Sequence, residues 1–144
     1  MKKLIFLFGF IFLCGIVNAQ NYTCFNSSKY TIETYAPDKS GNMICIGIKK
    51  ETHNTCFYLN TTREEFFSSG NSFTKTKEYV KSRNIRVNNY GEGVEFTYED
   101  LTTATLFRRG NMATIIIIKG TENGVVLVYT YTCNEIYQAN VTFS

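Results

Sequence analysis

Side chains that could do catalytic chemistry are sparse in this sequence. His53 is the only histidine, and it lies in the polar stretch 49–54, where a solvated loop histidine is commoner than a general base. The adjacent carboxylates at 64–65 and 99–100 would point to opposite faces of a strand, so neither pair forms an acid–base dyad. No phosphate-binding glycine motif or cluster of metal ligands is present. We therefore expect a protein that is not an enzyme and that holds neither a metal nor a cofactor.

The first nineteen residues have the pattern of a secretory signal peptide. Two lysines precede an apolar run over residues 4–17, and small residues occupy the −3 and −1 positions before Gln20. The run is shorter than the roughly 20 residues of a membrane-spanning helix. We expect residues 1–19 to be removed and residues 20–144 to be one secreted, extracellular domain with no membrane span.

The predicted mature chain has an even number of cysteines, which in a small secreted protein indicates two disulfides. Three pairings are open, and the absence of a Cys-x-x-Cys spacing argues against zinc. The four residues are Cys24, Cys45, Cys56 and Cys133.

Strand parity places two of these cysteines away from the core. The isoleucines of 43–48 alternate, so Cys45 lies on the face opposite to them. Phe57 and Leu59 would share the core face, which leaves Cys56 on the other side. Both cysteines would then point outward.

A hairpin around residues 50–51 would bring Cys45 opposite Cys56 in a local bridge. Cys24 and Cys133 would then form a long-range bridge, which restricts the unfolded chain more. The alternative that joins Cys24 to Cys56 and Cys45 to Cys133 stays open.

Four triplets match the acceptor pattern for N-glycosylation and would lie on the surface if they are used. Their asparagines are Asn21, Asn26, Asn60 and Asn140.

Runs rich in β-branched and aromatic residues recur at short spacing between turn residues, which predicts an all-β domain. Residues 62–68 and 76–83 are the only candidates for a helix. We expect a single antiparallel β-barrel of about eight strands, with a β-sandwich as the alternative. The predicted strands are 30–35, 43–49, 55–59, 72–80, 85–87, 94–98, 102–108, 113–119 and 125–132.

The interior of such a barrel would be lined on alternate positions. The runs 115–118 and 125–128 are apolar throughout, so we expect protein to cover both of their faces. Twelve Phe and ten Tyr would supply most of the core, or the wall of a small ligand cavity. The wall positions predicted by parity are Tyr30, Ile32, Phe57, Val94, Phe96, Tyr98 and Tyr129.

The order of these features resembles the divergent salivary lipocalins of blood-feeding arthropods. The resemblance rests on Cys24 before a first strand, a second strand that carries Cys45, and two late strands that end in Tyr131-Thr132-Cys133. It implies an eight-stranded barrel that sequesters small amines or lipids, or inhibits a host defence protein. The chain lacks Trp and the Gly-x-Trp motif of that family, and no binding residue carries over by position.

Two functions follow as hypotheses. The first is a secreted, non-enzymatic carrier that sequesters a small hydrophobic or amine ligand in the barrel interior. The second is a secreted immune or surface-interaction module with a filled core and an exposed apolar patch that binds a host or surface protein. The net charge of +3 is spread among acids, which argues against nucleic acid as a partner.

Overall fold

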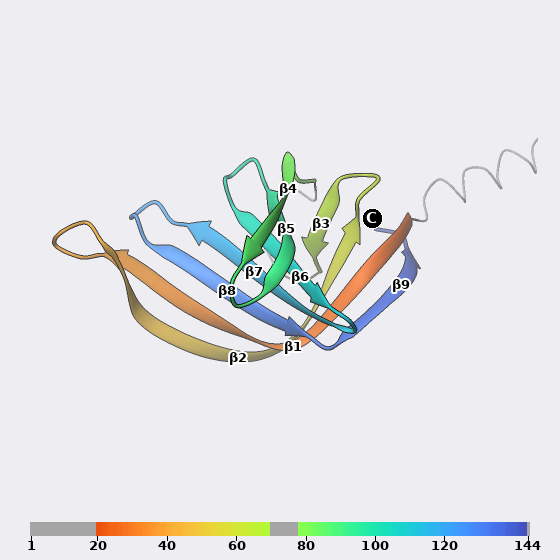
Figure 1. Cartoon of the computed structure of the whole chain (residues 1–144), viewed down its shortest axis with the longest axis horizontal. Coiled ribbons are helices and arrows are strands. Elements are labelled where there is room, and N and C mark those ends of the chain that lie inside the picture. The colour runs from red at the N-terminus through yellow and green to blue at the C-terminus, as the bar shows by residue number, and fades with distance from the viewer. Residues whose placement is uncertain (1–19, 70–77, 144) are drawn as a thin grey trace, which may run out of the picture.

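The computed structural model describes residues 20–69 and 78–143, which form nine strands in one antiparallel sheet. The order across the sheet is β3-β2-β1-β8-β7-β6-β5-β4, and β9 pairs with β1. The sheet curls into a half-barrel (Figure 1), so the predicted all-β antiparallel fold is confirmed. The strands are β1 (Gln20–Pro37), β2 (Met43–Asn60), β3 (Glu65–Ser68), β4 (Lys81–Val87), β5 (Gly91–Thr97), β6 (Thr103–Arg109), β7 (Met112–Gly120), β8 (Val126–Cys133) and β9 (Glu135–Val141).

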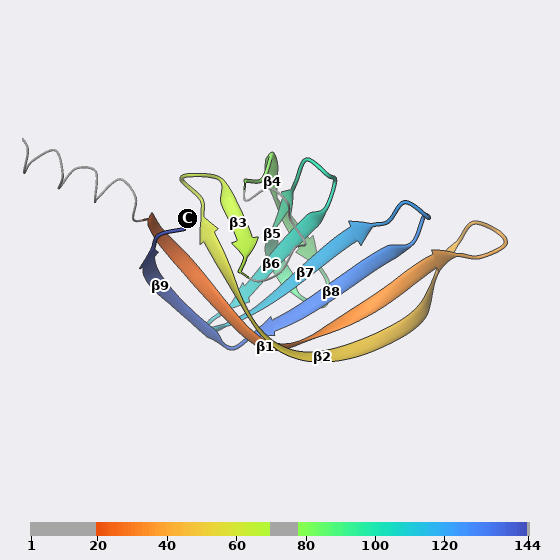
Figure 2. The same cartoon turned by 180° about the vertical axis from the view of Figure 1, so that it is seen from behind.

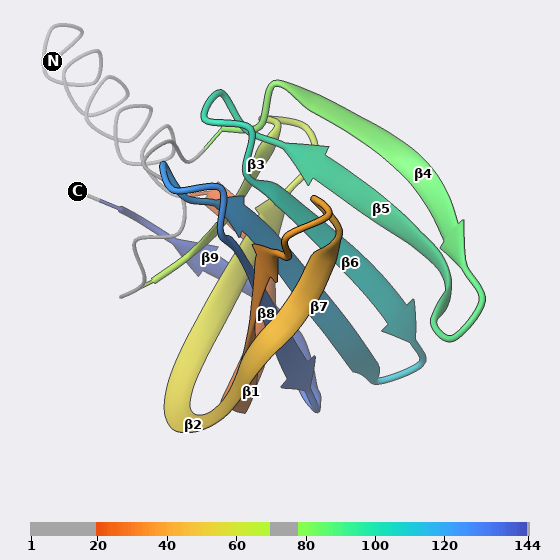
Figure 3. The same cartoon turned by 90° about the vertical axis from the view of Figure 1, so that its left-hand side faces the viewer.

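The curl brings the two edges of the sheet toward each other, as the view in Figure 3 shows. A single β-bridge joins Glu65 in β3 to Glu78, and the Tyr79 amide donates to the Glu64 carbonyl at 3.0 Å. The next amide, that of Val80, donates to the Thr97 carbonyl at the end of β5 at 2.8 Å. These bonds link the β3 edge to the β4–β5 side, although no full ladder closes the barrel there.

Aromatic side chains fill the inside of the curl. The ring centroid of Phe66 lies 4.8 Å from that of Phe96 and 5.9 Å from that of Phe57, which is itself 4.8 Å from Tyr131. All four side chains are buried, and Ile115 and Ile117 complete the layer below them. Such ring pairs add roughly 0.5–1.5 kcal/mol each beyond the free energy of burial.

A second, smaller cluster lies on the outer face of β1 and β2. Tyr22 and Phe67 are buried there, and Tyr58 and Phe143 pack edge-on or stacked against them at 4.9–6.0 Å. Their neighbours Phe25 and Phe57 point into the main core, because successive side chains of a strand alternate between faces. We call this group, together with Cys24, the outer aromatic cluster.

Strands β1 and β2 are each 18 residues long and extend beyond the core. We call their outer half, residues 30–51, the wing. Its β1 side pairs with β8, and its tip extends past the other strands (Figure 2). The wing begins where the β1–β2 ladder is interrupted, between Ser27 and Lys29. At this point β1 also exchanges its other neighbour, since β9 pairs with 20–26 and β8 with 30–35.

The hairpin predicted around residues 50–51 is wrong. The chain runs through this point as one strand, with Lys50 opposite Thr31 and Glu51 opposite Tyr30. Residues 49–54 are polar because most of them face solvent on an extended strand. The turn lies at 38–42 instead, where the Asp38 carboxylate accepts the amides of Ser40 and Asn42 at 2.8 and 2.9 Å.

Other expectations also need correction. Residues 65–68 of the helix candidate 62–68 form β3, and strand β9 was not predicted. Ile115 and Ile117 are buried, but Ile118 is exposed, so the run 115–118 is not covered on both faces. Most of the predicted strand 72–80 lies outside the described residues, as does the start of the helix candidate 76–83, whose last residues begin β4. Among the described residues, no helix is long and apolar enough to cross a membrane.

Gly93 provides a test of how closely β5 packs against Phe107 of β6. It lies opposite Phe107, and a Cβ at this position would be 2.6 Å from the Phe107 ring and 2.8 Å from the Leu106 carbonyl oxygen. We expect Gly93→Ala to lower the free energy of unfolding by about 1–3 kcal/mol, because a backbone atom cannot move aside. Gly120→Ala, whose Cβ would meet nothing within 4 Å, is the matched control in urea unfolding. Equal midpoints for the two variants would contradict this packing.

Candidate functional site

The predicted wall residues occupy the concave side of the sheet, but they do not surround an empty space. Phe57, Phe96 and Tyr98 are buried members of the aromatic core. Tyr30, Val94 and Tyr129 pack against that core and are half-buried, and Ile32 is half-buried opposite Tyr129 in the β1–β8 ladder. Their role in ligand binding stays a prediction.

Tyr98 shows how tightly this part of the core is filled. Its hydroxyl donates to the backbone carbonyl of Phe66, which ties the end of β5 to β3 across the curl. Burial raises the pKa of Tyr98 well above its ordinary value of 10.0, because the ionised ring would lose its water. The hydroxyl therefore has a structural partner already.

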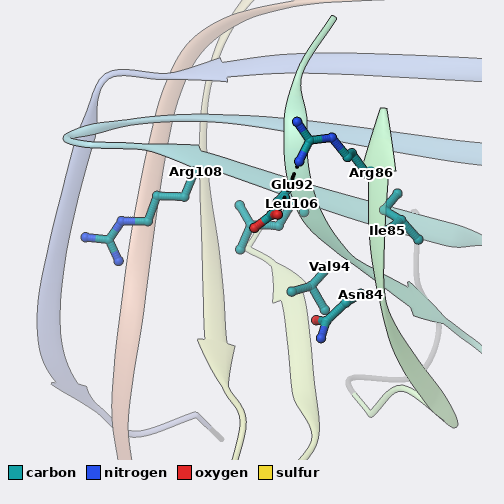
Figure 4. Close-up of a pocket in the computed structure, with 8 residues that line it drawn as sticks. Asn84, Ile85, Arg86, Glu92, Val94, Leu106 and Arg108 are labelled. Atoms are coloured by element: carbon teal, nitrogen blue, oxygen red, sulfur yellow. Dashed lines mark hydrogen bonds and ion pairs between the residues drawn. The ribbon is translucent and has the colours of Figure 1, made fainter. Parts of the chain in front are cut away.

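An open hollow of about 740 Å³ lies beside the filled core, over β4, β5 and β6. Val94 and Leu106 form its apolar floor, while Arg86 and Glu92 face each other across the β4–β5 ladder at 3.3 Å. Arg108 of β6 also lines the hollow, and in Figure 4 its guanidinium lies apart from the other labelled residues. The lining residues are Asn84, Ile85, Arg86, Glu92, Gly93, Val94, Leu106 and Arg108.

The outer edge of β2 is the most exposed apolar feature of the wing. Within the described residues, β3 covers this edge only at 57–60, so residues 43–56 have no neighbouring strand on that side. Every residue of 43–50 is exposed, and Ile44, Ile46 and Ile48 are 48, 59 and 67% exposed. Together with Met43 they form an apolar row along an unpaired strand that presents both of its faces, because the β-bulge at Ile46 places Ile44 and Ile48 on opposite faces. We call residues 43–56 the open edge.

Charges flank this apolar row on the inner side of the open edge. The Lys49 ammonium pairs with the Glu51 carboxylate at 2.6 Å. Within the described part of the chain Lys50 forms no ion pair, and it is exposed. A partner on this edge would therefore meet apolar side chains first and then a positive charge.

The open edge is the feature that sequence reasoning missed. Alternation of the isoleucines suggested a core-facing strand, but their strand extends past the end of the core, so nothing covers them. One signal was available. Residues 49–54 are all polar or charged. If this run is a strand, both of its faces must be exposed to solvent.

The predicted glycosylation sites fall on strands β1, β2 and β9. Asn21 and Asn140 are exposed and lie opposite each other in the β1–β9 ladder. Asn26 is half-buried and its side-chain amide donates to Glu135 at 3.2 Å. The Asn60 side chain accepts the Arg63 amide at 3.2 Å. Use of these sites stays a prediction.

The four cysteines among the described residues are free thiols in the structure, and they lie in three different environments. Cys45 is exposed on the wing, whereas Cys24 and Cys56 adjoin the outer aromatic cluster. Cys133 is a buried member of the main core, and burial raises the pKa of its thiol to about 12. The proposed bridge between Cys45 and Cys56 is incompatible with this fold, since both belong to one continuous strand.

The structure assembles no catalytic group around the residues that sequence analysis considered. His53 is exposed on β2. Glu65 is buried, but it is held by the Tyr22 hydroxyl at 3.1 Å and by Arg63 at 2.9 Å. Among residues 20–69 and 78–143, no three His, Cys, Asp or Glu side chains gather in a way that could hold a metal ion.

Comparison of the chain with protein-family models, with curated proteins and with solved structures finds no match. The likeness to salivary lipocalins therefore remains a resemblance of layout, and the site has to be interpreted from its own geometry.

Titration of Tyr98 supplies a test of the filled interior. Because its pKa is raised in the folded state, its contribution to stability is present below about pH 10 and is lost as the pH rises further. We expect urea unfolding to show stability that falls steeply above pH 10. Tyr98→Phe should cost about 1–2 kcal/mol at pH 7 through the lost hydrogen bond and should flatten that decline. Parallel pH profiles for the two proteins would show that Tyr98 is not buried as described.

Proposed function

We propose that this chain is a secreted protein-binding module that captures an extended segment of another protein along the open edge of β2. The observation that carries the proposal is the wing, where eight successive residues from Met43 to Lys50 are exposed on a strand with one unpaired edge. The filled core supports a module of this kind better than a carrier with an internal cavity.

An unpaired strand edge is a binding surface because its backbone groups alternate outward. Along residues 43–52, the residues that do not bond to β1 direct their N–H and C=O away from it, and a β-bulge at Ile46 shifts this alternation once. An added strand would satisfy those groups, and side chains at alternate positions would give the selectivity. Natural proteins usually protect such an edge with Pro, with charge or with a covering loop. Residues 43–48 contain neither Pro nor a charged residue.

The chemistry of the open edge defines the partner. Ile44 and Ile48 lie on opposite faces of β2, so the edge favours apolar side chains on both faces of the bound segment. Lys50 favours a carboxylate on the part of the segment that lies beside it, since Lys49 is already paired with Glu51. The preferred segment is therefore extended, apolar on both faces, and acidic toward one end.

The proposal is tested with a displayed library of random 12-residue peptides selected on the purified chain. We expect the enriched peptides to bind at least tenfold more weakly to Ile48→Lys, because a lysine at the edge opposes strand pairing. Val80→Lys is the matched control, since Val80 is 61% exposed and lies outside the wing.

Both variants should keep the wild-type melting temperature, because exposed positions contribute little to stability. Equal binding to the two variants, or a library without enrichment, would refute the proposal.

A second function is supported by the hollow over β4–β6. Its volume of about 740 Å³ falls within the size range of small-molecule sites. Val94 and Leu106 would contact an apolar body, and Arg108 would contact an acidic or polar group. The ligand would lie beside the barrel core rather than inside it.

Native mass spectrometry of protein purified from its natural host tests this second function. We expect a retained small molecule that is lost in Val94→Trp, since the larger side chain fills the hollow. Val87→Trp on the same hairpin is the control, because Val87 does not line the hollow. A protein mass without added ligand, or equal retention by both variants, would remove the hollow as a binding site.

A further inference from the structure

The position of Cys45 excludes every two-disulfide pairing within this fold. Cys45 lies opposite Tyr35 at the outer part of the wing. Cys56 is eleven positions away on the same strand, which is about 36 Å at roughly 3.3 Å per residue. A disulfide needs Cα atoms within about 7 Å. Cys45 and Cys56 therefore cannot be joined.

The other two thiols are also beyond the reach of Cys45. Cys24 lies opposite Tyr58, near the far end of β2, so it is as distant from Cys45 as Cys56 is. Cys133 is two residues beyond Tyr131, which pairs with Tyr30 of β1. Tyr30 is five positions along β1 from Tyr35, the partner of Cys45, so Cys133 is at least that far from Cys45 along the strands. Each of the three two-bridge pairings uses Cys45, so none of them fits the described chain.

The remaining three cysteines are separated by the sheet. Cys24 and Cys56 belong to the face that carries the outer aromatic cluster. Cys133 packs in the main core with Phe25 and Phe57, on the opposite face. A bond from Cys24 to Cys133 would have to cross the backbone of β1, which excludes the long-range bridge predicted from the sequence.

Cys24 and Cys56, by contrast, are cross-strand neighbours on one face. Cys24 pairs with Tyr58 and Asn26 pairs with Cys56, so the two cysteines are diagonal to each other in the β1–β2 ladder. Such residues are roughly 7–8 Å apart in a flat sheet. Twist shortens one of the two diagonals, and the two thiols are near enough that Cys56 contributes to the raised pKa of Cys24.

We propose that Cys24 and Cys56 form the single intramolecular disulfide of this protein, while Cys45 and Cys133 stay reduced within the chain. The oxidant is an external disulfide, either a small molecule such as oxidised glutathione or a thiol–disulfide oxidoreductase. Two protein thiols and one external disulfide give one protein disulfide and two external thiols, so atoms and electrons balance.

The geometry also orders the two steps. Cys56 is half-buried and reaches solvent, so its thiolate attacks the external disulfide and releases one external thiolate. Burial and the adjacent sulfur raise the pKa of Cys24 to about 11, which makes Cys24 the poorer first nucleophile. Cys24 then passes its proton to the released thiolate and attacks the Cys56 sulfur, which displaces the second external thiol.

The experiment oxidises the purified chain with oxidised glutathione and maps its tryptic peptides without reduction. The four cysteines fall on different peptides, since cleavage after Lys and Arg gives 40–49, 51–63 and 120–144, and Cys24 lies on 20–29 in the processed chain or on 4–29, with Cys14, in the full chain. We expect 20–29 joined to 51–63, with Cys45 alkylated in the native protein and Cys133 only after unfolding. Four free thiols, a link between 20–29 and 120–144, or an intramolecular link that includes 40–49 would overturn the proposal.

Variants separate the bridge from misfolding. Cys45→Ser and Cys133→Ala should each retain the linked peptide pair. Cys24→Ser should abolish it and lower the melting temperature of the oxidised protein by about 10 °C, as reduction of the wild type should. Because the oxidant is added in vitro, the outcome does not depend on export or on the proposed function of the open edge. A linked pair that persists in Cys24→Ser would contradict the assignment.

Discussion

The contact between Phe66 and Phe96 holds this sheet in its curled form. Phe66 belongs to the short strand β3, whereas Phe96 belongs to β5 near the opposite edge, and their rings meet at 4.8 Å. The Tyr98 hydroxyl bonds to the backbone beside the same contact. Twist and β-bulges bend the sheet, and these interactions hold its two edges together once it has bent. The inward-facing buried residues of β1, β2 and β7 depend on that bend for their cover.

Two long strands then create the exposed part of the molecule. The core needs only about half of β1 and β2, so the rest continues as the wing. The same geometry separates the cysteines, because a thiol on the wing cannot approach one near the core. β1 and β2 are thus longer than the core that they cover. This extra length leaves the edge of β2 unpaired, and it also keeps Cys45 too far from the other thiols to form an internal bridge.

Local sequence patterns predicted much of the fold but little of the site. Alternation correctly identified most of the strands and placed Phe57, Phe96 and Tyr98 on the inner face, since a period of two is a local property. The hairpin at 50–51 failed because polar residues mark solvent exposure as well as turns. The isoleucines of 43–48 were assigned inward because alternation cannot show where a core ends. Cysteine pairing failed for a related reason, since it depends on which strands become neighbours.

β1 takes its second neighbours, β8 and β9, from the last fifth of the chain, although β1 itself is at the start. No ribosome-bound intermediate can complete this sheet, because the segments that flank β1 are made last. The chain therefore stays unfolded until β8 and β9 are available. Contacts between residues so distant in sequence also make folding slow. This topology therefore favours folding after β8 and β9 have been synthesised rather than during synthesis.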